Sequence, residues 1–201
     1  MRRLDDSLLI ATHNAGKFEE LTALLEPLGI RTVFARDLGL AEPDETGTTF
    51  IENARIKAHA AATATGLPAL ADDSGIEIDA LGGAPGVYTA DWAETPAGRD
   101  FVLAMHKAHK LLVESGASAP WTARFCCTLV LAWPDEEDAA FEGKVEGQVV
   151  WPMRGTQGHG YDPIFVPDGH DQTFAEMDRW EKNRMSHRAV ALDKLVKALG
   201  A

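Results

Sequence analysis

Apolar residues in the first part of the chain change from a short run to helical spacing. Leu8 to Ala11 form an apolar run that breaks at Thr12 to Gly16. Apolar positions then recur every three or four residues until Gly29, at Phe18, Leu21, Leu24, Leu25 and Leu28. A run of four suits a buried strand, and the later spacing suits one face of a helix. The pattern predicts strand, loop and helix, with a second strand at Thr32 to Ala35.

The next predicted helix follows an acidic loop at Asp37 to Gly47. Thr49 and Glu52 have the spacing of a capping box, in which the side chain of each residue accepts a hydrogen bond from the backbone N–H of the other. An alanine-rich segment continues to Thr65, where Gly66 provides a stop. A helix from about Thr49 to Thr65 is therefore expected.

The middle of the chain combines a strand pattern with an acidic cluster. The apolar run Pro68 to Ala71 leads into Asp72-Asp73-Ser74-Gly75, and Ile76 and Ile78 then alternate with acidic residues. Alternation of this kind is typical of a half-buried strand. We expect the cluster to lie at the end of a strand.

The rest of the chain reads as a helix, a hairpin, a short strand and a final helix. The helix is predicted at Asp100 to Ser115, and the hairpin at Ala123 to Ala132 and Phe141 to Val150. A strand at Ile164 to Val166 and a helix over 186–199 follow. No repeat or long linker interrupts the pattern, so one domain over 1–201 is expected. Strands alternating with helices, plus a hairpin, predict an α/β fold around a mixed sheet with flanking helices.

Composition narrows the range of partners. The chain has 201 residues and a formal net charge of −12, from 19 basic and 31 acidic residues. Such a charge repels a nucleic acid backbone, although local cations or a divalent metal still permit a small anionic ligand. The first apolar run is too short to insert into a membrane. Cys126 and Cys127 are adjacent on a predicted strand and point apart, which suits a reducing cytoplasm.

The segment from Thr12 to Lys17 lies where a strand turns into a helix. Its residues are Thr12, His13, Asn14, Ala15, Gly16 and Lys17. Backbone N–H groups at a helix start, with a lysine beside them, favour a phosphate. The segment lacks the glycine and hydroxyl of a Walker A loop. An ordinary turn with Asn14 as N-cap and a solvated Lys17 is the alternative.

Two adjacent carboxylates at Asp72 and Asp73 suit Mg²⁺ or the activation of a water molecule, because Mg²⁺ takes few carboxylates and keeps water and substrate oxygens. Acidic side chains at Glu42, Asp44 and Glu45 could add a ligand. The alternative is an ordinary Asp-Ser-Gly turn.

Two later segments also suit a nucleotide. The glycine-rich loop from Arg154 to Pro163 could wrap a planar ring, with His159 or Tyr161 stacking on it, or could be an ordinary glycine loop. Four basic side chains of the segment 181–188 gather in an acidic chain, at Lys182, Arg184, His187 and Arg188. They suit phosphate recognition, although a solvated helix entry remains open.

Taken together, these segments resemble the inosine triphosphatase family, the non-canonical purine nucleoside triphosphate pyrophosphatases. The resemblance runs from Leu8 to Leu199 and rests on six motifs in register. They are T-x-N-x-x-K at 12–17, F-x-E-N-A-x-x-K-A at 50–58, A-D-D-S-G at 71–75, G-G-A-P-G-V-Y at 82–88, G-x-G-Y-D-P-I-F at 158–165 and S-H-R at 186–188. It implies two lobes with a central nucleotide cleft, a homodimer, and Mg²⁺-dependent hydrolysis of ITP, dITP and XTP to the monophosphate and pyrophosphate.

The resemblance also implies a role for each matching residue. The triphosphate would be held by the first loop, at Thr12, His13, Asn14 and Lys17. Asp73 would be the acid/base residue and a metal ligand, with Glu45 as the second metal-linked carboxylate. Further substrate contacts would come from Ser74, His159, Gly160, Tyr161, Asp162, Lys182, His187 and Arg188. Family members commonly carry phenylalanine at the position of His159 and arginine at that of Asp91, so this chain departs from the pattern there.

We therefore expect a cytoplasmic enzyme that removes deaminated purine triphosphates and acts on neither nucleic acid nor membrane. Two alternatives remain open at this point. One is a related pyrophosphatase for other modified nucleotides, and the other is a non-catalytic nucleotide-binding module. Asp73 and Lys17 together favour a working enzyme, because a binding module needs no acid/base group.

Overall fold

The computed structural model describes residue 4, residues 7–135 and residues 137–200. The chain divides into two compact units, each assembled from separate stretches of sequence. The first unit comprises the stretch that ends at Asp73, Cys127–Gly143 and the stretch that begins at Arg188. The second unit comprises Ser74–Cys126 and Lys144–His187. The prediction of one domain over 1–201 stays a prediction.

The strands form one six-stranded mixed sheet in the order β2-β1-β3-β6-β7-β8. Its strands are β1 (Ser7–Ile10), β2 (Arg31–Phe34), β3 (Ala69–Ile78), β6 (Trp121–Ala132), β7 (Asp138–Val149) and β8 (Phe165–Pro167). β1 pairs parallel with both β2 and β3, whereas β7 pairs antiparallel with β8. β6 and β7 follow each other in the chain and are neighbours in the sheet, as the predicted hairpin requires. The mixed α/β fold with flanking helices is confirmed.

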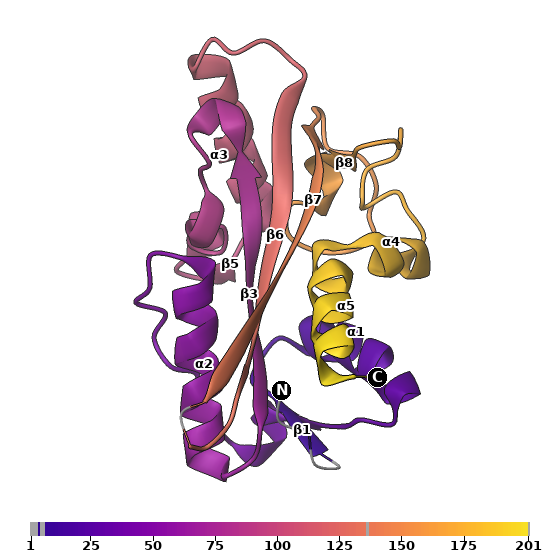
Figure 1. Cartoon of the computed structure of the whole chain (residues 1–201). Coiled ribbons are helices and arrows are strands. Elements are labelled where there is room, and N and C mark those ends of the chain that lie inside the picture. Colours follow the sequence, from indigo (N-terminus) through magenta and orange to yellow (C-terminus); the bar gives the residue numbers. More distant parts are fainter. Residues whose placement is uncertain (1–3, 5–6, 136, 201) are drawn as a thin grey trace. The chain divides into compact units, whose positions relative to one another are not determined.

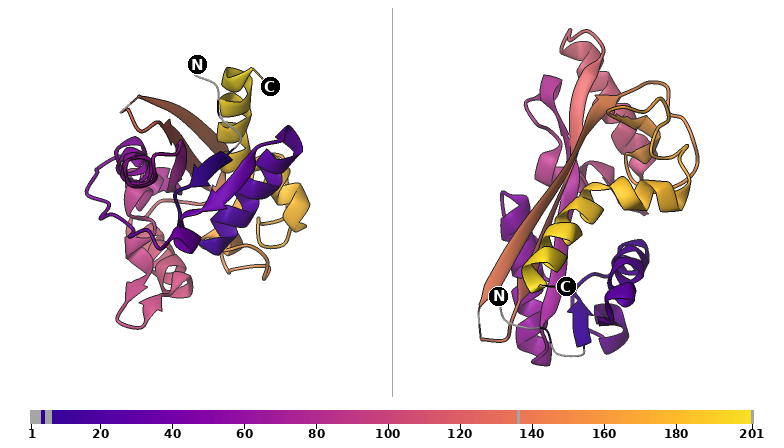
Figure 2. Two further views of the ribbon diagram at one scale, coloured as in Figure 1. Left: turned by 90° about the horizontal axis from the view of Figure 1, so that it is seen from below. Right: turned by 45° about the vertical axis from the view of Figure 1, so that its right-hand side comes forward.

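The first unit places its helices on both faces of the strands (Figure 1). Its helices are α1 (Ala15–Leu25), α2 (Phe50–Thr65) and α5 (His187–Leu199), the last from Arg188 onward. Two views in Figure 2 show α2 on one side of the strands and α1 and α5 on the other.

Each face of the first unit has its own hydrophobic core. On one face, leucines of α1 and α5 pack against Leu8, Ile10 and Leu70. On the other face, the alanines of α2 pack against Leu9 and the alanines of β3. Alternate residues of a strand point to opposite faces, which explains why Leu8 and Leu9 belong to different cores.

The second unit is built around a core of aromatic side chains. Its helices are α3 (Phe101–Glu114) and α4 (Arg179–Met185), and it has a two-stranded ribbon of β4 (Glu94–Thr95) and β5 (Gly98–Arg99). Phe125, Phe165 and Phe174 lie in contact at its centre, with ring centroids 4.7 to 5.8 Å apart.

Short 3-10 helices are found in both units, at Glu26–Leu28, Ala35–Leu38, Asp79–Leu81, Gly86–Tyr88, Asp91–Ala93 and Asp162–Ile164. Within the described ranges, no helix has the length and apolar character needed to cross a membrane.

Local signals set the ends of α2 as predicted. The Thr49 hydroxyl accepts a hydrogen bond from Glu52 N, and the Glu52 carboxylate accepts from Thr49 N. Gly66 ends the helix in the left-handed conformation, with φ of 70°. The capping box and the glycine stop are confirmed.

One prediction about local structure was wrong. Asp72 to Gly75 lie inside the ten-residue strand β3, neither at the end of a strand nor in a turn. The strand continues there because β6 remains its neighbour after the short β1 has ended. The predicted final helix is confirmed at His187–Leu199, but the sequence did not predict the separate helix α4 before it, and the two meet at Ser186, whose backbone is extended.

Replacing Thr49 by alanine should destabilise the protein by about 1 kcal/mol, because the first turn of α2 loses a partner for its backbone N–H groups. Urea unfolding followed by circular dichroism would measure the change. Thr63→Ala is the matched control, because Thr63 is exposed within the same helix and alanine has the better helix propensity. Equal losses from the two variants would contradict the capping role.

Candidate active site

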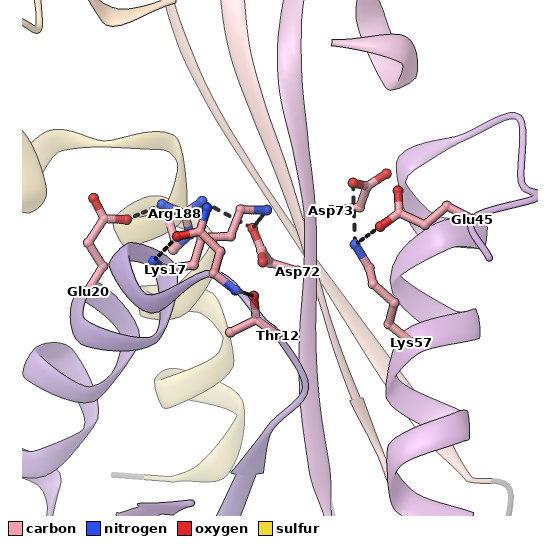
Figure 3. A network of polar contacts seen from close by, with 9 residues as sticks. Thr12, Lys17, Glu20, Glu45, Lys57, Asp72, Asp73 and Arg188 are labelled. Atoms are coloured by element: carbon pink, nitrogen blue, oxygen red, sulfur yellow. Dashed lines mark hydrogen bonds and ion pairs between the residues drawn. The ribbon is translucent and has the colours of Figure 1, made fainter. Parts of the chain in front are cut away.

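Asp72 and Asp73 are neighbours on β3, and their side chains point to opposite faces of the strand (Figure 3). Asp72 faces Lys17 of α1 and Arg188 of α5, whereas Asp73 faces Lys57 of α2. The alternation of side chains along a strand enforces this separation. The two carboxylates therefore belong to two different charge clusters.

The cluster around Asp72 is buried and densely paired. Asp72 Oδ2 lies 3.0 Å from Lys17 Nζ and 3.1 Å from Arg188 Nη2, and Arg188 also pairs with Glu20. Burial opposes the charge on Asp72, but Lys17, Arg188 and Lys57 together hold its pKa well below the ordinary value. Asp72 is a permanent anion that fixes two cations.

The loop before α1 has the geometry of a helix N-terminus. The Asn14 side chain accepts a hydrogen bond from Lys17 N at 3.2 Å, so Asn14 is the N-cap. Asn14 N in turn donates to the hydroxyl of the buried Thr12, also at 3.2 Å. The cap agrees with the ordinary-turn alternative, but Lys17 is paired with a buried carboxylate instead of being solvated. Such a helix start with a fixed lysine is suited to an anion.

The cluster around Asp73 contains two carboxylates and one ammonium group. Lys57 Nζ lies 2.6 Å from Glu45 Oε1 and 3.5 Å from Asp73 Oδ1. Burial raises the pKa of Asp73 to about 6, although Lys57 acts in the opposite direction. Burial also works against the charge of Lys57, yet Asp73, Asp72 and Glu45 raise its pKa overall. Lys57 is thus charged at neutral pH, while Asp73 can take up and release a proton.

Glu45 and Asp73 fit the requirements of a magnesium ion. Their oxygens are the hard ligands that Mg²⁺ prefers, and the ion usually takes one or two carboxylates and completes its shell with water and substrate oxygens. The raised pKa of Asp73 reflects a buried anion with too little positive charge around it, which a divalent cation would supply. Within the described part of the chain, no group of three or more His, Cys, Asp or Glu side chains could hold a metal alone. Two protein ligands are what this site offers.

In the second unit, Asp162 organises the glycine-rich loop. Its Oδ2 accepts hydrogen bonds from Lys182 Nζ at 2.5 Å and from His159 N at 2.8 Å. A Cβ at Gly158 would lie 2.1 Å from the same oxygen, so this position requires glycine. Asp162 and Lys182 are both buried, and the ion pair fixes the shape of the loop.

The structure divides the predicted site residues between the two units. Thr12, His13, Asn14, Lys17, Glu45, Asp73 and Arg188 lie in the first unit, and Ser74, His159, Gly160, Tyr161, Asp162, Lys182 and His187 lie in the second. Tyr161 is fully buried, and His187 is stacked on Phe125 with ring centroids 5.0 Å apart. His159 is exposed. The substrate contacts implied for these residues stay predictions.

Two charged residues of these clusters, Lys57 and Glu20, were not among the site residues predicted from the sequence. Lys57 could have been found, because helical spacing places it on the face of α2 that carries Ala54, Ala58 and Ala61. A single lysine among small buried residues indicates a paired charge. Nothing in the sequence distinguishes Glu20 from the neighbouring Glu19, which is exposed.

Comparisons with known proteins agree with the fold and the motifs. The model of the Ham1 family matches residues 8–198. A protein of Ruegeria pomeroyi named dITP/XTP pyrophosphatase is 65% identical over 192 residues, covering 96% of this chain and 94% of that protein. A protein of the same name from Agrobacterium fabrum is 56% identical, with 98% and 97% covered. The structure of a HAM1 protein from Coxiella burnetii matches with a TM-score of 0.89 at 38% identity, covering 96% of this chain and 98% of that one.

The fold and the two charge clusters define an α/β protein with a buried carboxylate–lysine site suited to phosphate chemistry. The chain belongs to the Ham1 family.

Asp73→Asn should remove a pH dependence of stability. The pKa of Asp73 is raised from the ordinary 3.8 to about 6 on folding, so the native state binds more protons in this range. The contribution of Asp73 to the free energy of unfolding is therefore complete below pH 4, and it is lost as the pH rises through 6. Relative to the Asp73→Asn variant, the wild type should lose at most on the order of 3 kcal/mol between pH 4 and pH 7. Urea unfolding of both proteins across this pH range measures the loss. If the free energy of unfolding changed with pH in the same way in the wild type and in Asp73→Asn, the raised pKa of Asp73 would be contradicted.

Proposed function

We propose that the chain hydrolyses non-canonical purine nucleoside triphosphates, namely dITP, XTP and ITP, to the monophosphate and pyrophosphate. Membership of the Ham1 family and relatives named dITP/XTP pyrophosphatase support this substrate class. The observation that carries the chemistry is the pair of carboxylates, Glu45 and Asp73, which both lie within 3.5 Å of Lys57 Nζ. That arrangement combines a metal-binding pair with a group that can accept a proton.

Asp73 is the general base in this proposal. With a pKa of about 6, it is mostly ionised at neutral pH and still basic enough to take a proton from the attacking water. Lys57 holds the carboxylate oxygen Oδ1 in place and keeps the positive charge beside it. Glu45 and Asp73 would hold Mg²⁺, which when bound neutralises phosphate charge and polarises a phosphoryl oxygen.

The triphosphate is assigned to the loop before α1. Lys17 offers a cation that Asp72 holds in a fixed position, and the backbone N–H groups at the helix start add a positive field. Arg188 supports this arrangement from α5 by pairing with Asp72. Prior fixation lowers the entropic cost of binding a flexible anion.

The finer parts of the proposal rest on the resemblance. They are the use of Mg²⁺, a homodimer and a cytoplasmic location, together with base contacts from the second unit. The net charge of −12 supports a small-molecule substrate over nucleic acid. A related pyrophosphatase with another modified nucleotide, or a non-catalytic binding module, remains a distinct outcome of the assay.

The test is pyrophosphate release from dITP, XTP, ITP and the standard triphosphates, with and without Mg²⁺. We expect turnover of the deaminated purines only with Mg²⁺, and a loss of at least about a hundredfold in Asp73→Asn, since the amide cannot accept the proton. Binding without turnover would identify a non-catalytic module. A preference for a different modified nucleotide would replace the substrate class.

Lys17→Met and Lys57→Met should separate the two clusters kinetically. Loss of Lys17 removes a contact to the triphosphate and should lower kcat/KM by about ten- to a hundredfold, mainly through KM. Loss of Lys57 removes the partner of the general base and should act mainly on kcat. Lys110→Met is the control, because Lys110 is exposed on α3 and pairs with Glu114 of the same helix. Equal effects on KM in the two site variants would contradict the assignment.

A further inference from the structure

His13 is the residue of the first loop whose side chain turns toward another loop. Its Nε2 lies 2.7 Å from the carbonyl oxygen of Leu40, 27 positions away in the chain. Because a carbonyl oxygen only accepts, Nε2 carries the proton and donates. Nδ1 lies 3.9 Å from Glu42. The ring also lines a cavity of about 160 Å³ together with Leu40, Glu42 and Lys57.

The loop that His13 contacts carries Glu45. Residues 40–47 contain neither helix nor strand, and most of them are exposed. A loop of this kind needs side-chain contacts to hold one conformation, because apart from Leu40, which packs against the alanine-rich core, it buries little apolar surface. The position of Glu45 therefore depends on the few groups that anchor this loop.

The end of the loop nearest α2 is tied to that helix. Gly47 N donates to Asn53 Oδ1 at 2.8 Å, and Thr48 N donates to Glu52 Oε2 at 2.7 Å. A Cβ at Gly47 would lie 2.6 Å from both Asn53 Oδ1 and Glu52 Cβ, so the backbone is pressed against the helix. This end is well fixed.

The other end has a weaker backbone anchor. Leu40 N donates to Ala35 O at 3.4 Å, a long hydrogen bond, whereas the contact from His13 to Leu40 O is short. His13 lies between Thr12 and Asn14, which are fixed to each other by a hydrogen bond. The ring thus joins the loop before α1 to the loop that carries Glu45.

We propose that His13 is a positioning residue that holds the 40–47 loop so that Glu45 stays beside Lys57 and Asp73. The inference rests on the proposed function in giving Glu45 a role at the metal. It replaces the expectation that the side chain of His13 contacts the triphosphate. In this chain, His13 couples the phosphate-binding loop to the metal-binding loop.

Hydrogen exchange measured by mass spectrometry tests the coupling without any substrate. His13→Ala should speed the exchange of peptides covering 40–47 by about two- to tenfold, because an anchoring hydrogen bond is lost. His13→Gln should restore protection, since its amide N–H can donate to the same carbonyl. His59→Ala is the matched control, because both histidines have side chains 30% exposed and His59 bonds Asp138 instead. Unchanged exchange in His13→Ala would overturn the proposal.

Kinetics then distinguish positioning from substrate contact. In His13→Ala we expect the Mg²⁺ concentration for half-maximal turnover to rise by about tenfold or more, with little change in KM for dITP at saturating Mg²⁺. His13→Gln and His59→Ala should behave like the wild type. A rise in KM with an unchanged Mg²⁺ requirement would overturn the proposal and favour direct substrate contact. An inactive wild type with faster loop exchange in His13→Ala would reject the proposed function and keep the anchoring role.

Discussion

Two consecutive carboxylates inside a buried strand impose the constraint on which the site depends. A buried anion needs cations or hydrogen-bond donors, because its hydration is lost. Asp72 and Asp73 point to opposite faces of β3, so each carboxylate needs its own cation as an ion-pair partner. The protein supplies Lys17 and Arg188 on one face and Lys57 on the other.

The layers of the first unit follow from the same alternation. The leucine-rich core lies with α1 and α5 on the face of Asp72, and the alanine-rich core lies with α2 on the face of Asp73. Small alanines allow α2 to approach the strand closely, which brings the buried Lys57 within reach of Asp73. Packing thus decides which pKa falls and which rises. The well-paired Asp72 stays ionised, whereas burial raises the pKa of Asp73 to about 6.

Helix caps connect the backbone to this chemistry. Asn14 begins α1 three residues before Lys17, and the Thr49 capping box begins α2 two turns before Lys57. A fixed helix start determines the direction of every side chain that follows, because the rotation per residue is constant. The capping box also ties Thr48 to Glu52, so it serves both the helix and the end of the loop that carries Glu45.

The sequence by itself determined those elements whose signals are local. Periodicity, caps and glycine stops predicted α1, α2 and the hairpin, whereas the acid/base role of Asp73 is a prediction from the resemblance of the motifs. Tertiary structure alone decided the partners of each charge. Arg188 meets Glu20 across 168 positions, and no local pattern encodes such a contact. The same holds for His13, which meets Leu40. The physical reason is that pairing depends on which faces pack together, and this is settled only when the strands assemble into a sheet.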